Sequence, residues 1–332
     1  MRPPASISAL PSLVELERAS AIVHAVIPPT PQQRWPLLDR RVGAEVWVKH
    51  ENQTPVGAFK VRGGLVFFHE LAASGQKVTG VVTATRGNHG QSVGLAAARH
   101  GIKAVVVVPR GNSVEKNAAM RALGVELIEH GDDFQASSEH AAALAAERGW
   151  YRVPSFHPWL VQGVGTYALE FFRGAPALDT VYVPIGLGSG ICGMIAARDA
   201  LGLRTEIVGV VSSLAPAYAL SFAAGKPVSA PVTTVLSDGM ACRSPVPEAL
   251  DILLAKLARV VPVSDAQVAE AMRAIFSDTH NVAEGAGAAP LAALLLEREA
   301  MRGRRVGMVL SGGNVDRDVF ARVLSGTDLG GP

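Results

Sequence analysis

Runs of apolar residues alternate with polar and glycine-rich turns, and they predict a repeating order of strands and helices. Between residues 80 and 149, three units follow one another, each with a strand, a helix and a glycine that ends the helix. The predicted strands are 81–83, 103–108 and 125–128, and the predicted helices are 91–99, 113–123 and 134–148. Such units are typical of a parallel sheet with helices on its faces. The continuous apolar run 104–108 indicates a strand that is covered on both sides.

Elements of the same kinds flank this central part. We predict an amphipathic helix over 12–25, with Ser12 as N-cap and Glu15 completing a capping box. The other predicted strands are 45–49, 180–185, 206–211 and 306–310, and the other predicted helices are 60–74, 166–172, 191–201, 265–277 and 290–298. A chain of 332 residues exceeds the size of about 250 to 300 residues at which single cores stop growing. We therefore expect a large domain of residues 1–75 and 155–332 with a small domain of residues 78–152 inserted in it.

Composition and charge exclude several classes of protein. The 31 basic and 29 acidic residues give a formal charge of +2, too balanced for a nucleic-acid-binding surface. No run of about 18 apolar residues occurs and the N-terminal residues lack a signal-peptide pattern, so we expect no contact with a membrane. The two cysteines, Cys192 and Cys242, are expected to be buried thiols in a cytoplasmic protein. Past Leu324 only a short polar tail remains, and we expect no C-terminal regulatory domain.

The first candidate for chemistry is a lysine that follows a turn. Pro55 and Gly57 predict the turn, and Lys60 lies at the expected start of the next helix. The positive end of the helix dipole and burial beside Phe59 both disfavour an ammonium, so we expect a lowered pKa for Lys60. A neutral amine is a nucleophile or a base. From this stretch alone, a solvated lysine on a surface helix is the simpler interpretation.

Two further loops change that interpretation. The stretch Gly57-Ala58-Phe59-Lys60-Val61-Arg62-Gly63 is followed by Gly87-Asn88-His89-Gly90-Gln91 after one predicted strand and by Ser311-Gly312-Gly313-Asn314 after another. In this order they resemble the serine/threonine dehydratase family of pyridoxal 5′-phosphate enzymes, and the resemblance runs from about residue 29 to about residue 324. It implies fold type II of these enzymes, a two-lobed, three-layer α/β fold of parallel sheets with a smaller domain inserted in a larger one.

The resemblance also implies residues that bind pyridoxal phosphate. This cofactor needs a Schiff-base lysine, a phosphate site and partners for its ring. By resemblance, Lys60 forms the Schiff base and then acts as the catalytic base, and Asn88 hydrogen-bonds the ring hydroxyl. Ser311 faces the pyridine nitrogen and Glu284 lies near the edge of the pyridine ring. The phosphate is expected in the loop of Gly186, Leu187, Gly188, Ser189 and Gly190.

This glycine-rich loop lies between a predicted strand and a predicted helix. Backbone N–H groups in such a loop, at a helix N-terminus, bind a phosphate dianion. Residues 188–193 also match the dinucleotide pattern G-x-G-x-x-G, but the next strand ends in Val210-Val211-Ser212-Ser213, without the acidic residue that a ribose requires. A purely structural tight turn is the other alternative. The resemblance favours the cofactor phosphate.

The substrate is expected at the loop of Thr85, Arg86, Gly87 and His89. Relatives usually have a small residue at the position of Arg86, and in serine racemases a serine there is the second acid or base. An arginine stays charged and is a poor base, so we expect racemisation to be disfavoured. Its guanidinium can bind a carboxylate, either the α-carboxylate or a distal one, or it can turn outward. We expect His89 to be a packed, hydrogen-bonded histidine rather than a proton carrier.

A serine beside the pyridine nitrogen bears on the reaction, because a neutral hydroxyl does not hold the ring protonated as a carboxylate would. We therefore expect a dehydratase that converts a β-hydroxy-α-amino acid to a 2-oxo acid and ammonia. The substrate is left open between threonine or serine, a phenylserine and a hydroxyaspartate. The alternatives are β-replacement, a threonine synthase-like reaction, and a non-catalytic amino-acid-binding module. We expect no dedicated metal ligands, and a homodimer or higher homo-oligomer.

Overall fold

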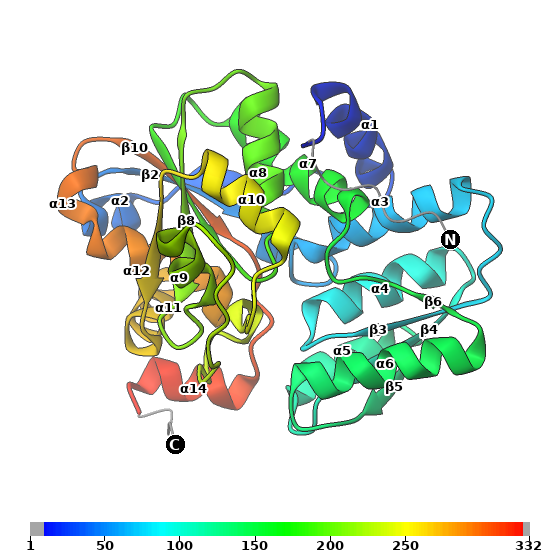
Figure 1. Cartoon of the computed structure of the whole chain (residues 1–332). Coiled ribbons are helices and arrows are strands. Elements are labelled where there is room, and N and C mark those ends of the chain that lie inside the picture. Colours follow the sequence, from blue (N-terminus) through cyan, green and yellow to red (C-terminus); the bar gives the residue numbers. More distant parts are fainter. Residues whose placement is uncertain (1–9, 328–332) are drawn as a thin grey trace.

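Two sheets organise the chain (Figure 1), and the computed structural model describes residues 10–327. The larger sheet has six strands in the order β1-β2-β10-β7-β8-β9, and its β1–β2 pair is antiparallel while its other pairs are parallel. The smaller sheet has four parallel strands in the order β5-β4-β3-β6. The predicted α/β fold with parallel sheets is thus confirmed.

The strands of the larger sheet come from both ends of the chain, whereas those of the smaller sheet come from its middle. The larger sheet consists of β1 (Gln32–Arg34), β2 (Glu45–His50), β7 (Thr180–Pro184), β8 (Glu206–Ser212), β9 (Arg259–Val263) and β10 (Arg305–Leu310). The smaller sheet consists of β3 (Gly80–Ala84), β4 (Lys103–Val108), β5 (Glu126–Glu129) and β6 (Tyr151–Arg152).

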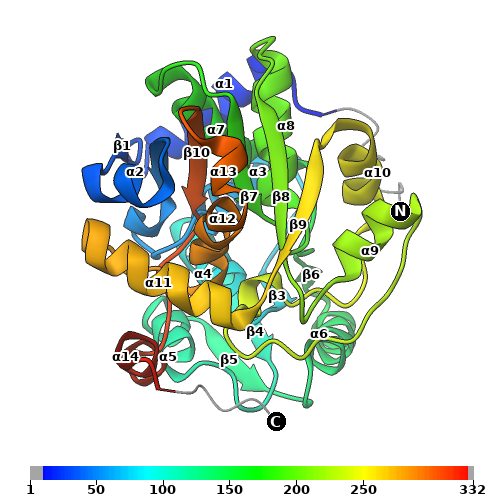
Figure 2. The same cartoon turned by 90° about the vertical axis from the view of Figure 1, so that its left-hand side faces the viewer.

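Helices cover both faces of each sheet (Figure 2). On the larger sheet, one face packs against α2 (Pro36–Val42), α11 (Asp265–Thr279) and α12 (Gly285–Leu296), and the other against α7 (Pro158–Gly174), α8 (Ser189–Ala200) and α10 (Pro247–Lys256). On the smaller sheet, one face packs against α3 (Lys60–Ala73), α4 (Asn88–Arg99) and α5 (Val114–Ala122), and the other against α6 (Phe134–Arg148). Because α3 packs against both α4 and α7, it joins the two units.

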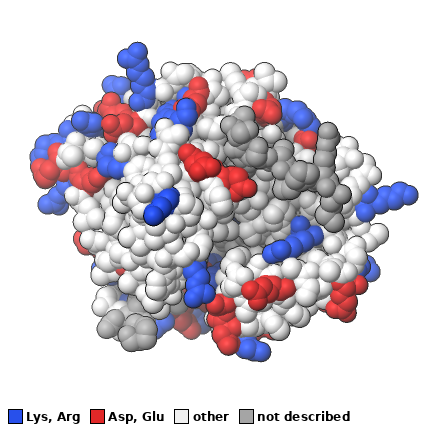
Figure 3. Space-filling model, viewed as in Figure 1, with Lys and Arg blue, Asp and Glu red and all other residues white. Residues whose placement is uncertain are grey.

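The remaining helices pack around these layers and add residues such as Tyr218 and Val323 to the cores. They are α1 (Leu13–His24), α9 (Ala217–Ala224), α13 (Arg298–Met301), α14 (Arg317–Ser325) and two short 3₁₀ helices, Glu51–Gln53 and Asp238–Met240. None of the helices within residues 10–327 has the length and apolar character to cross a membrane. Figure 3 shows basic and acidic side chains interspersed over one face of the molecule, where they form no continuous basic patch.

Many predicted boundaries are confirmed, because they depend on local signals. Ser12 and Glu15 form the predicted capping box of α1, and α6 has the predicted bounds, ending at Gly149 in the left-handed conformation. In β4, residues 104–108 are buried, as their apolar run predicts. The whole smaller sheet falls within residues 78–152, the range predicted for the small domain.

Other boundaries differ from the predicted ones. Helix α7 contains the predicted helical stretch 166–172 but is longer, beginning at Pro158, because His157 caps it and proline is well suited to a first helical position. Helix α12 begins at Gly285 and contains Pro290, which was predicted to start it. Proline costs helix stability, but residues 285–294 are all buried in the core, and this packing outweighs the cost. Sequence reasoning made no prediction for several elements: β1, α2, β6, α9, α10, β9, α13 and α14.

The division into domains stays a prediction. Its outer ends, residues 1–9 and 328–332, lie outside the described residues, as does the N-terminal stretch in which no signal peptide is expected.

Candidate active site

A pocket of about 260 Å³ opens where the two units meet, beyond the carboxyl ends of β3, β7 and β10. In parallel sheets this edge is where ligands bind. Every residue predicted for the site lines it: Lys60, Thr85, Arg86, Gly87, Asn88, His89, Gly186, Leu187, Gly188, Ser189, Gly190, Glu284 and Ser311. The structure therefore brings the predicted residues together, while their individual roles stay predictions.

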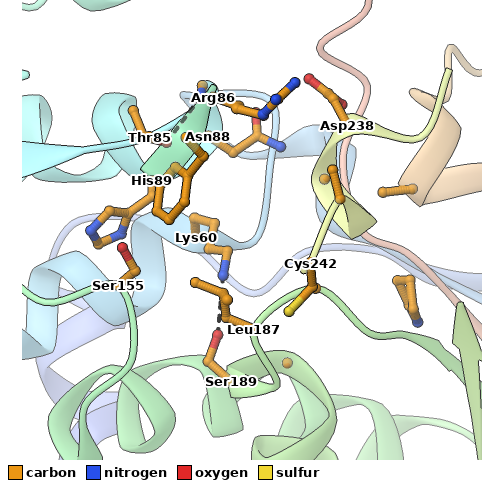
Figure 4. A pocket seen from close by; sticks show the side chains of 18 of the residues that line it. Lys60, Thr85, Arg86, Asn88, His89, Ser155, Leu187, Ser189, Asp238 and Cys242 are labelled. Carbon is orange, nitrogen blue, oxygen red and sulfur yellow. Dashed lines mark hydrogen bonds between the residues drawn. The ribbon is translucent and has the colours of Figure 1, made fainter. Parts of the chain in front are cut away.

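Lys60 is the first residue of α3 and its amine points into the pocket (Figure 4). Its Nζ donates to the Ser189 hydroxyl at 3.1 Å and lies 4.8 Å from the centre of the Phe59 ring. Burial lowers the pKa of Lys60 to about 8, and the charge of Glu284 opposes this shift. The direction is the one that the sequence predicts.

Backbone pairing joins the turn before Lys60 to the loop after β10. The N–H of Phe59 donates to the carbonyl of Ser311 at 3.0 Å, and Ala58 forms an isolated bridge with Gly312. Residues far apart in sequence are thereby fixed on one wall of the pocket. Ser311, 3% exposed, contributes its side chain to that wall.

The glycine-rich loop forms another part of the pocket lining. Gly188 has a φ of +104°, and a Cβ there would lie 2.6 Å from the Cβ of Ala249, so the loop requires glycine. Tyrosine hydroxyls hold the loop from behind: Tyr218 donates to the carbonyl of Leu187 and Tyr167 to that of Gly190, each at 3.0 Å. Because α8 begins at Ser189, its first N–H groups have no partners within the helix and are available to an anion.

A buried network of charges lies beside Asn88. The Asn88 amide donates to Oε1 of Glu284 at 2.6 Å, and Nζ of Lys116 lies 3.2 Å from Oε2 of Glu284 and 2.7 Å from Oδ2 of Asp238. Burial raises the pKa of Glu284, and Lys116 opposes that shift. Burial alone would lower the pKa of Lys116, but Glu284 and Asp238 together raise it, so this lysine is charged.

Sequence reasoning missed Lys116. A signal was present, because Lys116 lies in the first turn of the helix that follows the buried strand 103–108, at the same sheet edge as Asn88. Taken without the resemblance, Glu284 would be a surface carboxylate that caps a helix. The structure contradicts that alternative, because Glu284 is 3% exposed and its side chain makes no cap hydrogen bond.

The substrate loop holds two polar side chains with unused hydrogen-bonding atoms. Nε of Arg86 and Nε2 of His89 are buried, and neither has a hydrogen-bond partner among the described residues. Burial lowers the pKa of His89 to about 3, so its ring is neutral. His89 is buried, as expected of a packed histidine, but its Nε2 does not make the kind of hydrogen bond that was expected of the ring with any described residue, and its role stays a prediction. Figure 4 places Arg86 and Ser189 on opposite sides of Lys60.

Part of the remaining lining belongs to no motif that sequence reasoning used. It includes Phe134 and Gln135 from the start of α6, Ser155, and Cys242 and Arg243 from the segment before α10. Nη1 of Arg243 lies 3.7 Å from Oδ2 of Asp133. Cys242 and Cys192 are free, buried thiols, and burial raises the pKa of both. Within residues 10–327, no three His, Cys, Asp or Glu side chains gather as a metal site would require, and the expectation about metal ligands stays a prediction.

Comparisons with known proteins agree on one family. The sequence profile of the pyridoxal-phosphate dependent enzyme family matches residues 23–312. The chain is 32% identical to a biosynthetic L-threonine dehydratase of Salmonella typhimurium over 98% of its own length, and it spans 64% of the length of that relative. It is 29% identical to the L-threo-3-hydroxyaspartate ammonia-lyase of Saccharomyces cerevisiae, covering 97% of this chain and 98% of that one. Maize serine racemase has a similar structure, with a TM-score of 0.88, 27% identity, and coverage of 96% and 98% of the two chains.

Proposed function

The chain belongs to the pyridoxal-phosphate dependent enzyme family, and from this premise we propose that it is a dehydratase of β-hydroxy-α-amino acids. Its products are a 2-oxo acid and ammonia. One observation carries the proposal: Nζ of Lys60 lies 3.1 Å from Oγ of Ser189, at the start of α8, in the pocket that Asn88 and Ser311 also line. The relatives named as a threonine dehydratase and a hydroxyaspartate ammonia-lyase support this class of reaction.

The pocket has the donor set that pyridoxal phosphate requires. Residues 186–190 and the start of α8 offer backbone N–H groups to the phosphate, and the lowered pKa of Lys60 supplies an amine for the Schiff base. The Asn88 amide is held by hydrogen bonds to Glu284 and from Asn314, at 2.6 and 2.9 Å, and it would hydrogen-bond the ring hydroxyl of the cofactor. Ser311, which lines the same pocket, would offer a neutral hydroxyl to the pyridine nitrogen.

When bound, the cofactor supplies an aldehyde for the substrate amine and a conjugated ring that delocalises the electron pair left on Cα. Lys60 takes the proton from Cα at Nζ, and burial keeps enough of its amine neutral for this task. The N–H groups at the start of α4 would bind the substrate carboxylate and so orient the substrate in the pocket beside that amine. The net reaction eliminates water across Cα–Cβ, and hydrolysis of the resulting imine gives the 2-oxo acid and ammonia without an oxidant.

The structural similarity to a serine racemase raises racemisation as a second candidate. A racemase needs a second acid on the face of Cα opposite the lysine. By the family resemblance, Arg86 occupies the position where serine racemases have that serine, and a guanidinium does not exchange a proton near neutral pH. This residue supports elimination over racemisation.

Absorbance and product assays test the proposal together. The holoenzyme should show the absorbance band of a lysine Schiff base and release 2-oxo acid and ammonia from a panel of serine, threonine, phenylserine and 3-hydroxyaspartate. Lys60→Ala should lose the band and at least about 10³-fold in turnover, since it removes both the covalent link and the base. Lys226→Ala, an exposed lysine outside the pocket, is the matched control and should retain both. Undiminished product formation by Lys60→Ala would contradict the proposal, and an amino acid formed from an added thiol would favour β-replacement.

We also propose a cytoplasmic enzyme that binds neither nucleic acid nor membranes and works as a homodimer or higher homo-oligomer. The free thiols Cys192 and Cys242 and the small formal charge of +2 support the first two statements. Light scattering of the purified protein tests the third.

A further inference from the structure

We propose that Arg86 binds a second carboxylate of the substrate, so that the preferred substrate is a β-hydroxy-α-amino dicarboxylic acid such as 3-hydroxyaspartate. This inference rests on the proposed dehydratase function and names its substrate class. It follows from a comparison of the positively charged side chains of the pocket with the negatively charged groups that each of them can bind.

The substrate α-carboxylate has a site that does not need Arg86. Helix α4 begins at Asn88, and its first internal hydrogen bond runs from the N–H of Gln91 to the carbonyl of Gly87 at 3.1 Å. The N–H groups of Asn88, His89 and Gly90 precede that bond and have no partners within the helix. Such a helix N-terminus, next to Lys60 in the same pocket, suits one carboxylate.

Arg86 is therefore a cation in excess of that need. The other arginine and the second lysine of the pocket face carboxylates: Arg243 lies 3.7 Å from Asp133, and Lys116 lies 2.7 Å from Asp238. Within residues 10–327, no carboxylate lies within ion-pair distance of Arg86, and its buried Nε has no hydrogen-bond partner. A buried donor without a partner is unfavourable, and an oxygen of a ligand can satisfy it.

The position of Arg86 points to the substrate rather than the cofactor phosphate. Figure 4 shows Arg86 across Lys60 from Ser189, on the far side from the glycine-rich loop. His89, which lines the same pocket, is neutral because burial lowers its pKa to about 3, so it neither repels nor neutralises an anion. A guanidinium in this position binds a carboxylate more strongly than a methyl or a phenyl group.

The decisive experiment compares substrates and variants by kcat/KM in the holoenzyme. The wild type should prefer L-threo-3-hydroxyaspartate to L-threonine by at least about 10-fold. Arg86→Gln should lower kcat/KM for 3-hydroxyaspartate about 100-fold and for threonine less than about 3-fold, because one charge-assisted interaction is lost with the acidic substrate only. Arg110→Gln is the control, since Arg110 is 64% exposed, pairs with Asp132 and lies outside the pocket lining.

A binding measurement separates this inference from the proposed function. L-Aspartate and L-alanine have no leaving group at Cβ, so the change that they cause in the cofactor absorbance reports affinity without dehydration. A preference for aspartate of at least about 10-fold that Arg86→Gln abolishes supports the inference, even if no substrate is dehydrated and the proposed function fails. If Arg86→Gln lowers the affinity for both amino acids equally, Arg86 binds the α-carboxylate. If the affinities do not change, Arg86 faces outward. Either result overturns the inference while leaving the dehydratase proposal intact.

Discussion

At the scale of single residues, Lys60 shows how position sets reactivity. It starts α3, lies against Phe59 and is enclosed by loops from both units, and burial lowers its pKa to about 8. Glu284, itself buried, acts in the opposite direction through its charge. The amine is therefore poised between its two protonation states near physiological pH, as a Schiff-base lysine and base requires.

The lowered pKa of Lys60 can be tested in the cofactor-free protein by the pH dependence of amine labelling. Only a neutral amine reacts, so acetylation of Lys60, followed by peptide mass spectrometry, should rise with a midpoint of about pH 8 rather than near 10.5. Glu284→Gln should move the midpoint to lower pH, because the carboxylate charge raises the pKa of Lys60. A midpoint near 10.5 in the wild type would contradict the effect of burial.

At the scale of secondary-structure elements, a buried ionic network fixes the helix that presents Lys60. Arg62, two residues further along α3, contacts Glu51 at 2.7 Å and Glu170 of α7 at 2.6 Å. Lys49 of β2 lies 2.6 Å from Glu170 as well. Burial alone would raise the pKa of Glu170, but Arg62 and Lys49 hold it at about 2. The network thus joins β2, α3 and α7 behind the pocket.

Removing one member of this network should be costly. Glu170→Gln leaves Arg62 and Lys49 short of a counter-charge, and we expect the free energy of unfolding to fall by about 3–5 kcal/mol at pH 7. Glu17→Gln, in an exposed pair that joins α1 to Arg173 of α7, should cost less than about 1 kcal/mol. Urea unfolding measures the loss of free energy of unfolding in both variants. Equal losses in the two variants would contradict the importance of burial.

The stability of the wild type and of Glu170→Gln can also be compared as the pH is lowered. The pKa of Glu170 is about 2 in the folded protein against a usual 4.5, so its contribution to stability is present above pH 4.5 and is lost as the pH falls toward 2. Over that range the stability of Glu170→Gln should depend less on pH than that of the wild type.

At the scale of the whole molecule, two helix N-termini meet across the junction of the units (Figure 2). Asp316, which precedes α14, accepts hydrogen bonds from the Ser113 hydroxyl at 2.5 Å and from the N–H of Glu115 at 3.3 Å, at the start of α5. In return, Glu115 accepts from the N–H of Arg317, the first residue of α14, at 3.0 Å. Each carboxylate therefore caps the helix of the other unit, and α5 also carries Lys116 into the pocket.

Breaking this mutual cap should loosen α5 on the larger unit. Caps and helix-dipole contacts each contribute about 0.5–2 kcal/mol, so Asp316→Ala should speed hydrogen exchange of the Val114 and Glu115 amides and weaken substrate binding several-fold. Asp318→Ala, an exposed residue 84% accessible that pairs with its neighbour Arg317, should change neither. Unchanged exchange in Asp316→Ala would show that α5 does not depend on Asp316.

The sequence by itself determined the class of fold and the chemical groups of the site. The alternation of apolar runs predicts the strands and helices. The loops that follow predicted strands contain Lys60, Asn88 and Ser311, which the sequence therefore identifies as candidates for one site. Such signals are local: a cap such as Ser12 acts within one helical turn, and a glycine such as Gly188 is required by its own backbone conformation.

Only the tertiary structure decided which charged groups are paired. Lys116 meets Asp238, 122 positions further along the chain, and Arg62 meets Glu170, 108 positions further along, while Arg86 is left to a ligand. The starts of α7 and α12 also depended on burial against other elements. The physical reason is that the stability of an ion pair or a buried helix depends on distance and desolvation in the folded molecule, which a one-dimensional pattern does not contain.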